Sequence, residues 1–178
     1  ALRELDHPAV VRFLDAGSTS SGLYLVMERV EGETLADRLD LRGPLASREA
    51  RALGLQLAGA LARVHALGIT HRDLKPENVF LRADGSACLA DFGLAQFGDA
   101  LAERLTQTGA IVGTPGYMAP EQAVGEARPE RARAIDVYGL GALLYAALTR
   151  VPPVAGATLL EVLAATAARE PTPVRELN

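Results

Sequence analysis

Residues 71–93 read HRDLKPENVFLRADGSACLADFG, and this stretch decides how the rest of the chain is interpreted. Its first half is a charged loop, because Pro76 lacks a backbone N–H and excludes a regular helix. Residues 79–81 read as a short strand, residues 84–85 are an Asp-Gly hairpin signal, and residues 87–90 read as the returning strand. The stretch therefore predicts a polar loop followed by a β-hairpin.

The predicted hairpin brings Asn78, before its first strand, close to Asp91, at the end of its second strand, with Asp73 on the loop beside them. Mg²⁺ prefers a few hard oxygen ligands while it keeps water and phosphate oxygens, so Asn78 and Asp91 suit a magnesium site. Asp73 is placed to orient an attacking hydroxyl and accept its proton, and Lys75 to steady the transferring phosphate. These residues predict phosphoryl transfer.

Three motifs occur in order: HRDLKPEN at 71–78, DFG at 91–93 and APE at 119–121. One such motif alone is weak evidence, since an ordinary polar loop or turn would explain it, but all three together resemble the protein kinase superfamily. GTPGYMAPE at 113–121, with Lys75, is similar to serine/threonine rather than tyrosine kinases. The resemblance implies an α+β, protein kinase-like fold, mainly the helical C-lobe plus the hinge and two N-lobe strands. It also implies transfer of the ATP γ-phosphate to a protein hydroxyl.

The composition fits one soluble domain: 178 residues, 49% hydrophobic and 22% charged. A net charge of −4 gives no basic footprint for nucleic acid. The single Cys88 cannot form an internal disulfide, and a strand pattern around it favours a buried thiol. Because no run of 18 apolar residues and no signal-peptide pattern occurs, we expect a cytoplasmic segment without membrane contact. The sequence does not indicate the oligomeric state, and a membrane anchor elsewhere in the full-length protein stays compatible with it.

Hydrophobic patterning predicts two strands, at residues 10–15 and 23–29, joined by turn-forming residues 16–22. Helices are expected over residues 34–41, 47–67, 134–148 and 158–170. Thr34 is the expected N-cap of the first helix and Ser47 that of the second.

By the resemblance, the chain is a partial protein kinase domain, with residues 1–30 as the end of an N-lobe and its hinge and residues 31–178 as a truncated C-lobe. Met27 would be the gatekeeper behind the nucleotide, and Phe80 would lie under the adenine. The implied nucleotide-binding residues are Met27, Glu28, Val30, Lys75, Asn78, Phe80 and Asp91. ATP and Mg²⁺ are the implied cofactors, and protein substrates the implied partners.

The resemblance also implies roles around the catalytic loop. Thr114 would bridge Asp73 and Lys75 beside the substrate hydroxyl, and Asp136 would hold the loop backbone through hydrogen bonds. His71 would join a hydrophobic spine completed by Leu2, Phe13 and Phe92. We expect His65, which no partner motif surrounds, to be structural.

Residues 91–121 match an activation loop, in which Thr106 and Thr108 lie. Arg72 directly before Asp73 marks, in this family, kinases that are switched on by phosphorylation of that loop. A phosphate on either threonine would pair with the Arg72 guanidinium. The competing interpretation is that both threonines are solvated and that Arg72 pairs with a surface carboxylate.

Parts of the family pattern have no counterpart in these residues: the glycine-rich loop, the V-A-I-K lysine and the arginine that pairs with Glu121. We therefore expect the 178 residues alone to be inactive or nearly so. Asp73, Asn78 and Asp91 are intact, which favours an enzyme over a kinase-like scaffold without activity. A small-molecule kinase of related fold is a third interpretation, disfavoured because such enzymes need no peptide platform.

Overall fold

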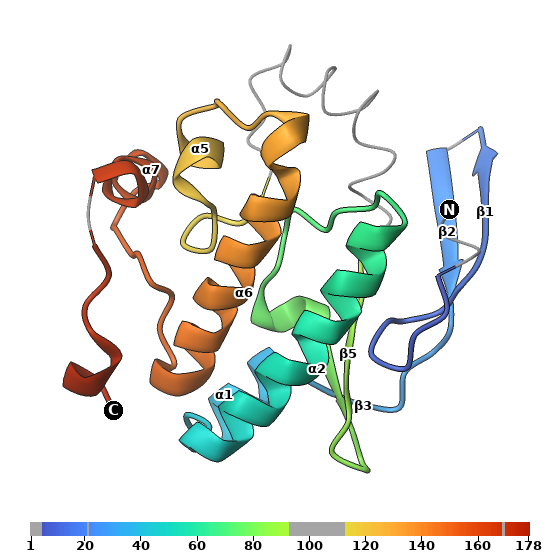
Figure 1. Ribbon diagram of the computed structural model, residues 1–178, viewed down its shortest axis with the longest axis horizontal. Coiled ribbons are helices and arrows are strands. Elements are labelled where there is room, and N and C mark those ends of the chain that lie inside the picture. Colours follow the sequence, from blue (N-terminus) through green and yellow to red (C-terminus); the bar gives the residue numbers. More distant parts are fainter. Residues whose placement is uncertain (1–4, 21, 93–112, 169) are drawn as a thin grey trace.

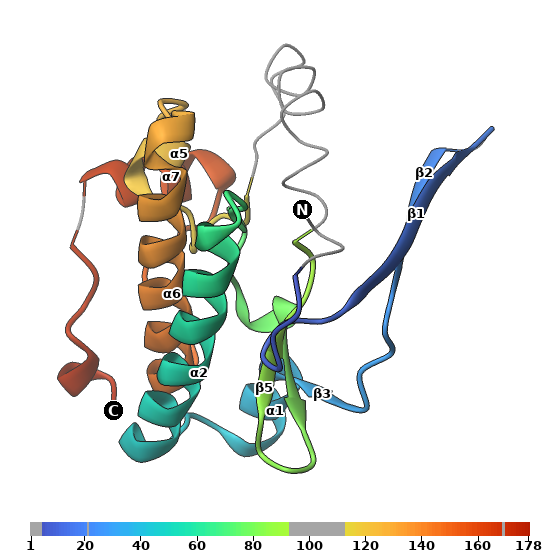
Figure 2. The ribbon, with the colours of Figure 1, turned by 45° about the vertical axis from the view of Figure 1, so that its right-hand side comes forward.

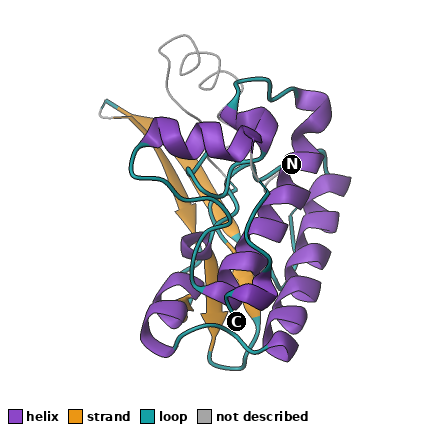
Figure 3. Ribbon diagram, turned by 90° about the vertical axis from the view of Figure 1, so that its left-hand side faces the viewer, coloured by secondary structure: helices purple, strands orange, loops and turns teal. Residues whose placement is uncertain are grey.

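Two long helices, α2 (Ser47–Ala66) and α6 (Ala132–Thr149), pack side by side through the centre of the molecule (Figure 1). The computed structural model describes residues 5–20, 22–92, 113–168 and 170–178. The remaining described helices are α1 (Leu35–Arg42), α5 (Pro120–Ala123), α7 (Leu159–Ala168) and the short 3₁₀ turns η2 (Pro76–Asn78), η3 (Pro129–Arg131) and η4 (Val174–Glu176). Figure 3 shows the helices as the largest regular elements of the described residues, with loops between them and the strands.

The core forms where α2 and α6 meet. Four apolar residues of α2 at helical spacing are buried: Leu53, Leu57, Leu61 and Val64. Gly54 allows close packing, because a Cβ built on it would lie 3.1 Å from the side chain of Leu144 on α6. No helix in the described part of the chain is both long and apolar enough to cross a bilayer.

The two hairpin strands predicted between residues 79 and 90 are confirmed as β4 (Val79–Arg82) and β5 (Ala87–Leu89), which pair antiparallel. A third strand, β3 (Gly32–Thr34), pairs with β4 on the other side, so the sheet order is β3-β4-β5. This strand was not predicted, because three residues carry too little pattern and their pairing partner lies far along the chain. Gly32 permits the pairing, since a Cβ there would overlap the carbonyl oxygen of Leu81.

The second sheet is the hairpin of β1 (Phe13–Thr19) and β2 (Gly22–Met27), which stands apart from the helices in Figure 2. The turn predicted over residues 16–22 is shorter than expected, because β1 continues through Thr19 and β2 begins at Gly22. Pairing continues from Phe13↔Met27 to Thr19↔Gly22, because the ladder of backbone hydrogen bonds overrides the turn-forming composition.

The hairpin is attached near its open end to the rest of the molecule. The N–H of Val11 donates to the Leu89 carbonyl at 2.8 Å, and the N–H of Leu89 donates to the Ala9 carbonyl at 3.0 Å. The N–H of Glu28 donates to the Arg12 carbonyl at 2.9 Å. Residues 10–12, predicted as strand, therefore serve as this attachment, with Val10 in an isolated parallel bridge to Leu89.

One predicted helix cap is confirmed and one is wrong. Thr34 caps α1: its hydroxyl accepts from the Asp37 N–H at 3.0 Å. The N-cap of α2 is Ala46 and not Ser47, because Ala46 is the last residue with extended angles and the Glu49 carboxylate accepts from its N–H at 2.9 Å. Glu49 therefore satisfies the helix start in place of a serine hydroxyl.

Candidate active site

Asp136, near the start of α6, anchors the loop at residues 71–75 through hydrogen bonds to its backbone. The Asp136 side chain is 1% exposed, and its carboxylate accepts hydrogen bonds from the N–H of His71 at 2.9 Å and from the N–H of Arg72 at 2.7 Å. Nε2 of His65 lies 2.7 Å from the same carboxylate. The predicted backbone anchor is therefore present, and His65, which we expected to be structural, completes it.

Arg72 has a left-handed backbone, with φ 66°. This conformation costs a non-glycine residue about 1–3 kcal/mol, so surrounding contacts must hold it. The Arg72 N–H is held by Asp136, and its carbonyl accepts from Nε2 of Gln122 at 3.0 Å. Its guanidinium Nε donates to the Thr70 hydroxyl at 3.2 Å.

Asp73, Lys75 and Thr114 form one hydrogen-bonded cluster. The Thr114 hydroxyl donates to Oδ1 of Asp73 at 2.8 Å and accepts from Nζ of Lys75 at 2.7 Å. Nζ of Lys75 also lies 3.1 Å from Oδ2 of Asp73. The structure therefore brings together three side chains from two segments about 40 residues apart in the sequence, in the arrangement that the resemblance implied.

Asn78 and Asp91 lie where the hairpin meets this loop. Asn78 is 6% exposed, and its Nδ2 donates to the Asp73 carbonyl at 2.9 Å. Its own carbonyl accepts from the N–H of Ala90, directly before Asp91, at 2.9 Å. Since Nδ2 is engaged, the side-chain oxygen of Asn78 is the atom that can serve as a ligand. Asp91 is exposed and has a φ of 62°.

The described residues contain no cluster of three or more His, Cys, Asp or Glu side chains able to hold a metal. One carboxylate and one amide oxygen nevertheless suit Mg²⁺, which takes one or two carboxylates and fills its remaining positions with water and phosphate. The donor set therefore fits a magnesium–nucleotide complex better than a metal held by the protein alone.

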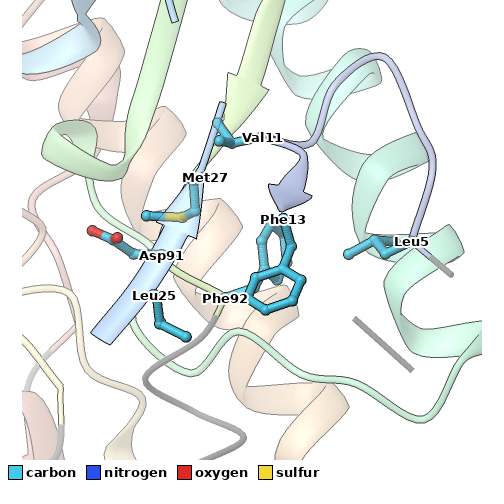
Figure 4. Close-up of a pocket in the computed structure, with 7 residues that line it drawn as sticks. All are labelled: Leu5, Val11, Phe13, Leu25, Met27, Asp91 and Phe92. Atoms are coloured by element: carbon cyan, nitrogen blue, oxygen red, sulfur yellow. The ribbon is translucent and has the colours of Figure 1, made fainter. Parts of the chain in front are cut away.

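His71 packs against the segment that contains the start of the DFG motif, where it contacts Ala90 and Phe92. It is 2% exposed, its Nε2 lies 2.8 Å from the Ala90 carbonyl, and its ring meets that of Phe92 edge-on at 4.7 Å. Burial lowers the pKa of His71, although Asp136 and other nearby carboxylates oppose this effect. Phe13 and Phe92 line one cavity, whose side chains are drawn in Figure 4. The predicted spine is present except for Leu2, which lies outside the described residues.

Three of the side chains predicted to bind the nucleotide lie close to one another. Met27, Val30 and Phe80 pack against a small buried cluster formed by Val11, Cys88 and Ala90. Burial raises the pKa of the Cys88 thiol, which fits a structural rather than a reactive residue.

Three contributors were missed at the sequence level: Thr70, Arg82 and Gln122. Arg82 links the hinge to the segment before β1, donating to the Pro8 carbonyl at 2.9 Å and to the Glu28 carboxylate at 3.3 Å. A charged residue at the end of an otherwise apolar strand was the available signal for Arg82. Gln122 follows the APE motif directly, but the contact it makes could not be read from sequence. Thr106 and Thr108 lie outside the described residues.

Comparison with known proteins identifies the family. The description "Protein kinase domain" matches residues 1–170. The serine/threonine-protein kinase PkaA of Streptomyces coelicolor is 46% identical over 165 residues, covering 91% of this chain and 30% of that protein. The serine/threonine-protein kinase pkn2 of Myxococcus xanthus is 42% identical over 177 residues, covering 97% of this chain and 21% of that protein. The chain thus spans about a fifth to a third of the length of these curated relatives.

The fold agrees with this assignment. The crystal structure of Rad53 1-466 in complex with AMP-PNP superposes with a TM-score of 0.73 at 30% identity, covering 92% of this chain and 39% of that chain. The chain belongs to the protein kinase family, and it groups with bacterial serine/threonine members of that family.

Proposed function

We propose that the full-length protein containing this chain is a serine/threonine protein kinase that transfers the γ-phosphate of ATP to a protein hydroxyl. The observation that carries the proposal is the cluster of Asp73, Lys75 and Thr114, whose polar atoms lie 2.7–3.1 Å apart. A carboxylate held beside an ammonium group provides a proton acceptor and a phosphate-binding cation at the same point. The names of the relatives support the same reaction.

In the proposed reaction, Asp73 orients the substrate hydroxyl and accepts its proton as the oxygen attacks the γ-phosphorus. The bond between the γ-phosphorus and the β,γ-bridging oxygen breaks, and ADP leaves. The positive charge of Lys75 stabilises the negative charge on the oxygens of the transferring phosphoryl group. Thr114 holds Asp73 and Lys75 at a fixed separation before the substrate arrives, which reduces the reorganisation needed at the transition state.

The nucleotide would bind between the hinge and the DFG hairpin. Met27, Val30 and Phe80 pack against one buried cluster and would offer an apolar surface for the adenine. The hinge backbone from Glu28 to Val30 would lie beside it. Asn78 and Asp91 would hold Mg²⁺ through their side-chain oxygens. When bound, Mg²⁺ neutralises charge on the phosphates.

The regulatory interpretation is also a proposal. A phosphate on Thr106 or Thr108 would carry about −1.5 to −2 charge and pair with the Arg72 guanidinium. In the described residues, the Nε of that guanidinium donates a hydrogen bond to the Thr70 hydroxyl at 3.2 Å. Ordering the loop in this way would fix Asp73 through its neighbour.

We place the chain within a larger kinase domain, with residues 1–30 contributing N-lobe and hinge and residues 31–178 contributing C-lobe. We further propose that the protein acts on protein substrates in the cytoplasm. The described residues of this segment offer no membrane-crossing helix.

The test compares full-length wild type with Asp73→Asn and Asp91→Asn, using a generic protein substrate, ATP and Mg²⁺. Asp73→Asn should lower kcat by about a hundredfold or more while nucleotide binding stays close to wild type. Asp91→Asn should also weaken Mg²⁺-dependent nucleotide binding, because a metal ligand is lost.

Asp40→Asn is the matched control, since Asp40 lies on the α1 surface with its side chain 86% exposed. Near-normal kcat in both test variants would refute the assignment of these aspartates. A folded wild type that binds nucleotide without transferring phosphate would instead favour the scaffold interpretation.

A further inference from the structure

Gln122 joins two parts of the site that are 50 positions apart in the sequence. Its Nε2 donates to the carbonyl of Arg72 at 3.0 Å, and its Oε1 accepts from the N–H of Ala119 at 3.0 Å. The two contacts fix the orientation of the amide, because a flipped amide would oppose oxygen to oxygen and N–H to N–H. Both polar atoms of the Gln122 amide are therefore hydrogen-bonded.

The carbonyl of Arg72 belongs to the peptide group that leads directly into Asp73. Arg72 is in the left-handed region, and its N–H is already held by Asp136 on α6. The contact from Gln122 holds the other side of the same residue. Asp136 on α6 thus restrains the His71–Arg72 peptide, and Gln122 on α5 restrains the Arg72–Asp73 peptide, whose rotation would move the Asp73 carboxylate.

Gln122 also lies on the segment that carries Thr114. Thr114 contacts Asp73 through its hydroxyl, and Gln122 contacts Arg72 eight residues later in the chain. Both residues line one small cavity together with Arg72 and Asp73. The two segments are therefore joined at two points, one at the Asp73 carboxylate and one at the backbone that supports it.

We propose that Gln122 is a positioning residue that fixes the Arg72–Asp73 peptide and thereby aims the Asp73 carboxylate at the substrate hydroxyl. The proposal rests on the proposed kinase function and adds a residue to it. Gln122 touches neither substrate nor nucleotide in this role, and acts only through Asp73. The competing explanation is that Gln122 merely caps α5 through Ala119.

Two substitutions separate these explanations. Gln122→Glu keeps the oxygen that accepts from Ala119 but replaces the donor to Arg72 with a second oxygen, which repels the carbonyl. Gln122→Met has a similar size and loses both contacts. Gln56→Glu is the matched control: Gln56 lies on α2, and its Oε1 accepts from the N–H of Ala87 at 2.9 Å, a contact that glutamate retains.

The full-length protein is assayed for kcat, for KM of ATP and for melting temperature. We expect Gln122→Glu to lower kcat about tenfold with KM for ATP and melting temperature near wild type, a tenfold change being the scale of one lost positioning contact. Gln122→Met should lose kcat and also melt at lower temperature. Gln56→Glu should match wild type in all three measurements.

Backbone hydrogen exchange over residues 70–75 gives a second readout that needs no catalysis. Exchange in this segment should become faster in Gln122→Glu but not in Gln56→Glu. If Gln122→Glu keeps both wild-type kcat and wild-type exchange, Gln122 is only a cap and the proposal is overturned. If no variant or wild type transfers phosphate, the proposed function fails, and unchanged exchange in Gln122→Glu would still reject the positioning role on its own.

Discussion

The carboxylate of Asp136 lies 2.7 Å from the backbone nitrogen of Arg72, and this contact joins the buried end of α6 to the residue before Asp73. The second oxygen of the same carboxylate accepts from the N–H of His71. Two successive N–H groups of the loop are therefore satisfied by one side chain of the core. The position of Asp73 depends on the packing of α6 as much as on the loop itself.

Asp136→Asn should lower both stability and activity. An amide offers one oxygen where the carboxylate offers two, so one loop N–H would face an NH₂ group. We expect a loss of about 2–3 kcal/mol in the free energy of unfolding, the scale for hydrogen bonds to a charged group, and a kcat at least about tenfold lower. Urea denaturation and steady-state kinetics measure the two effects. Asp40→Asn should change neither, and equal values for Asp136→Asn and wild type would contradict the anchoring role.

The Thr114 hydroxyl, rather than the bulk of the side chain, should matter for turnover. Thr114→Val preserves shape but removes the atom that contacts Asp73 and Lys75, and we expect kcat to fall about tenfold or more. Thr114→Ser keeps the hydroxyl and should stay within a few-fold of wild type. Phosphorylation of a generic protein substrate at saturating ATP provides the comparison. A serine variant as impaired as the valine variant would show that the hydroxyl alone does not account for the role of Thr114.

Replacing both loop threonines should prevent activation. After incubation with Mg²⁺ and ATP, the Thr106→Ala/Thr108→Ala double variant should remain less active than wild type, because Arg72 gains no phosphate partner. Mass spectrometry should find phosphate on at least one of these threonines in the wild type, and we favour Thr108. Equal activity, with neither threonine phosphorylated, would leave Arg72 with a structural role only.

His71 should make stability depend on pH. Burial lowers its pKa in the folded protein, so below the unfolded value of about 6.5 the unfolded chain binds a proton that the folded protein resists. The associated stability is fully present above about pH 6.5 and is lost as the pH falls towards the folded pKa, by at most about 1.4 kcal/mol per pH unit. Urea unfolding of wild type and His71→Phe between pH 5 and 8 should show a shallower slope in the variant. Parallel slopes would mean that His71 titrates alike in both states.

Gly32→Ala should destabilise the β3–β4 pairing. A methyl group at Gly32 would overlap the Leu81 carbonyl, so one of the strands must shift, and we expect a loss of about 1–3 kcal/mol. The control is Gly141→Ala on α6, where an added Cβ meets nothing within 4 Å and the helix should gain up to about 1 kcal/mol. Thermal unfolding of both variants measures the difference. A Gly32 variant as stable as wild type would show that β3 adapts without strain.

The sequence predicted the site best where chemistry and local backbone rules coincide. Asp84-Gly85 specifies the turn between β4 and β5, and that hairpin places Asn78 next to Ala90, directly before Asp91. The order of the three kinase motifs adds the remaining partners, and through the family resemblance it predicts the contact of Thr114 with Asp73 and Lys75.

Features that depend on distant backbone were not accessible in this way. The extension of β1 through Thr19 follows from its ladder with β2, which outweighs a Gly- and Ser-rich composition. The predicted N-cap of α2 was wrong for a local reason, since the Glu49 carboxylate accepts from the Ala46 N–H and no serine hydroxyl is needed. Gln122 and Arg82 donate hydrogen bonds to the main-chain carbonyls of Arg72 and Pro8. Every residue has such a carbonyl, so the sequence does not identify the acceptor.

The attachment of the β1–β2 hairpin has a mechanical consequence. The hairpin is fixed near Val11 and Glu28 and extends outward from them, so it has the geometry of a cantilever. Displacement of a cantilever grows with distance from its support: Met27, paired with Phe13 beside the support, moves little, whereas Gly22 at the far end moves most. Bending of the hairpin would therefore leave the apolar surface at Met27 and Val30 almost stationary while its tip sweeps through a wider arc.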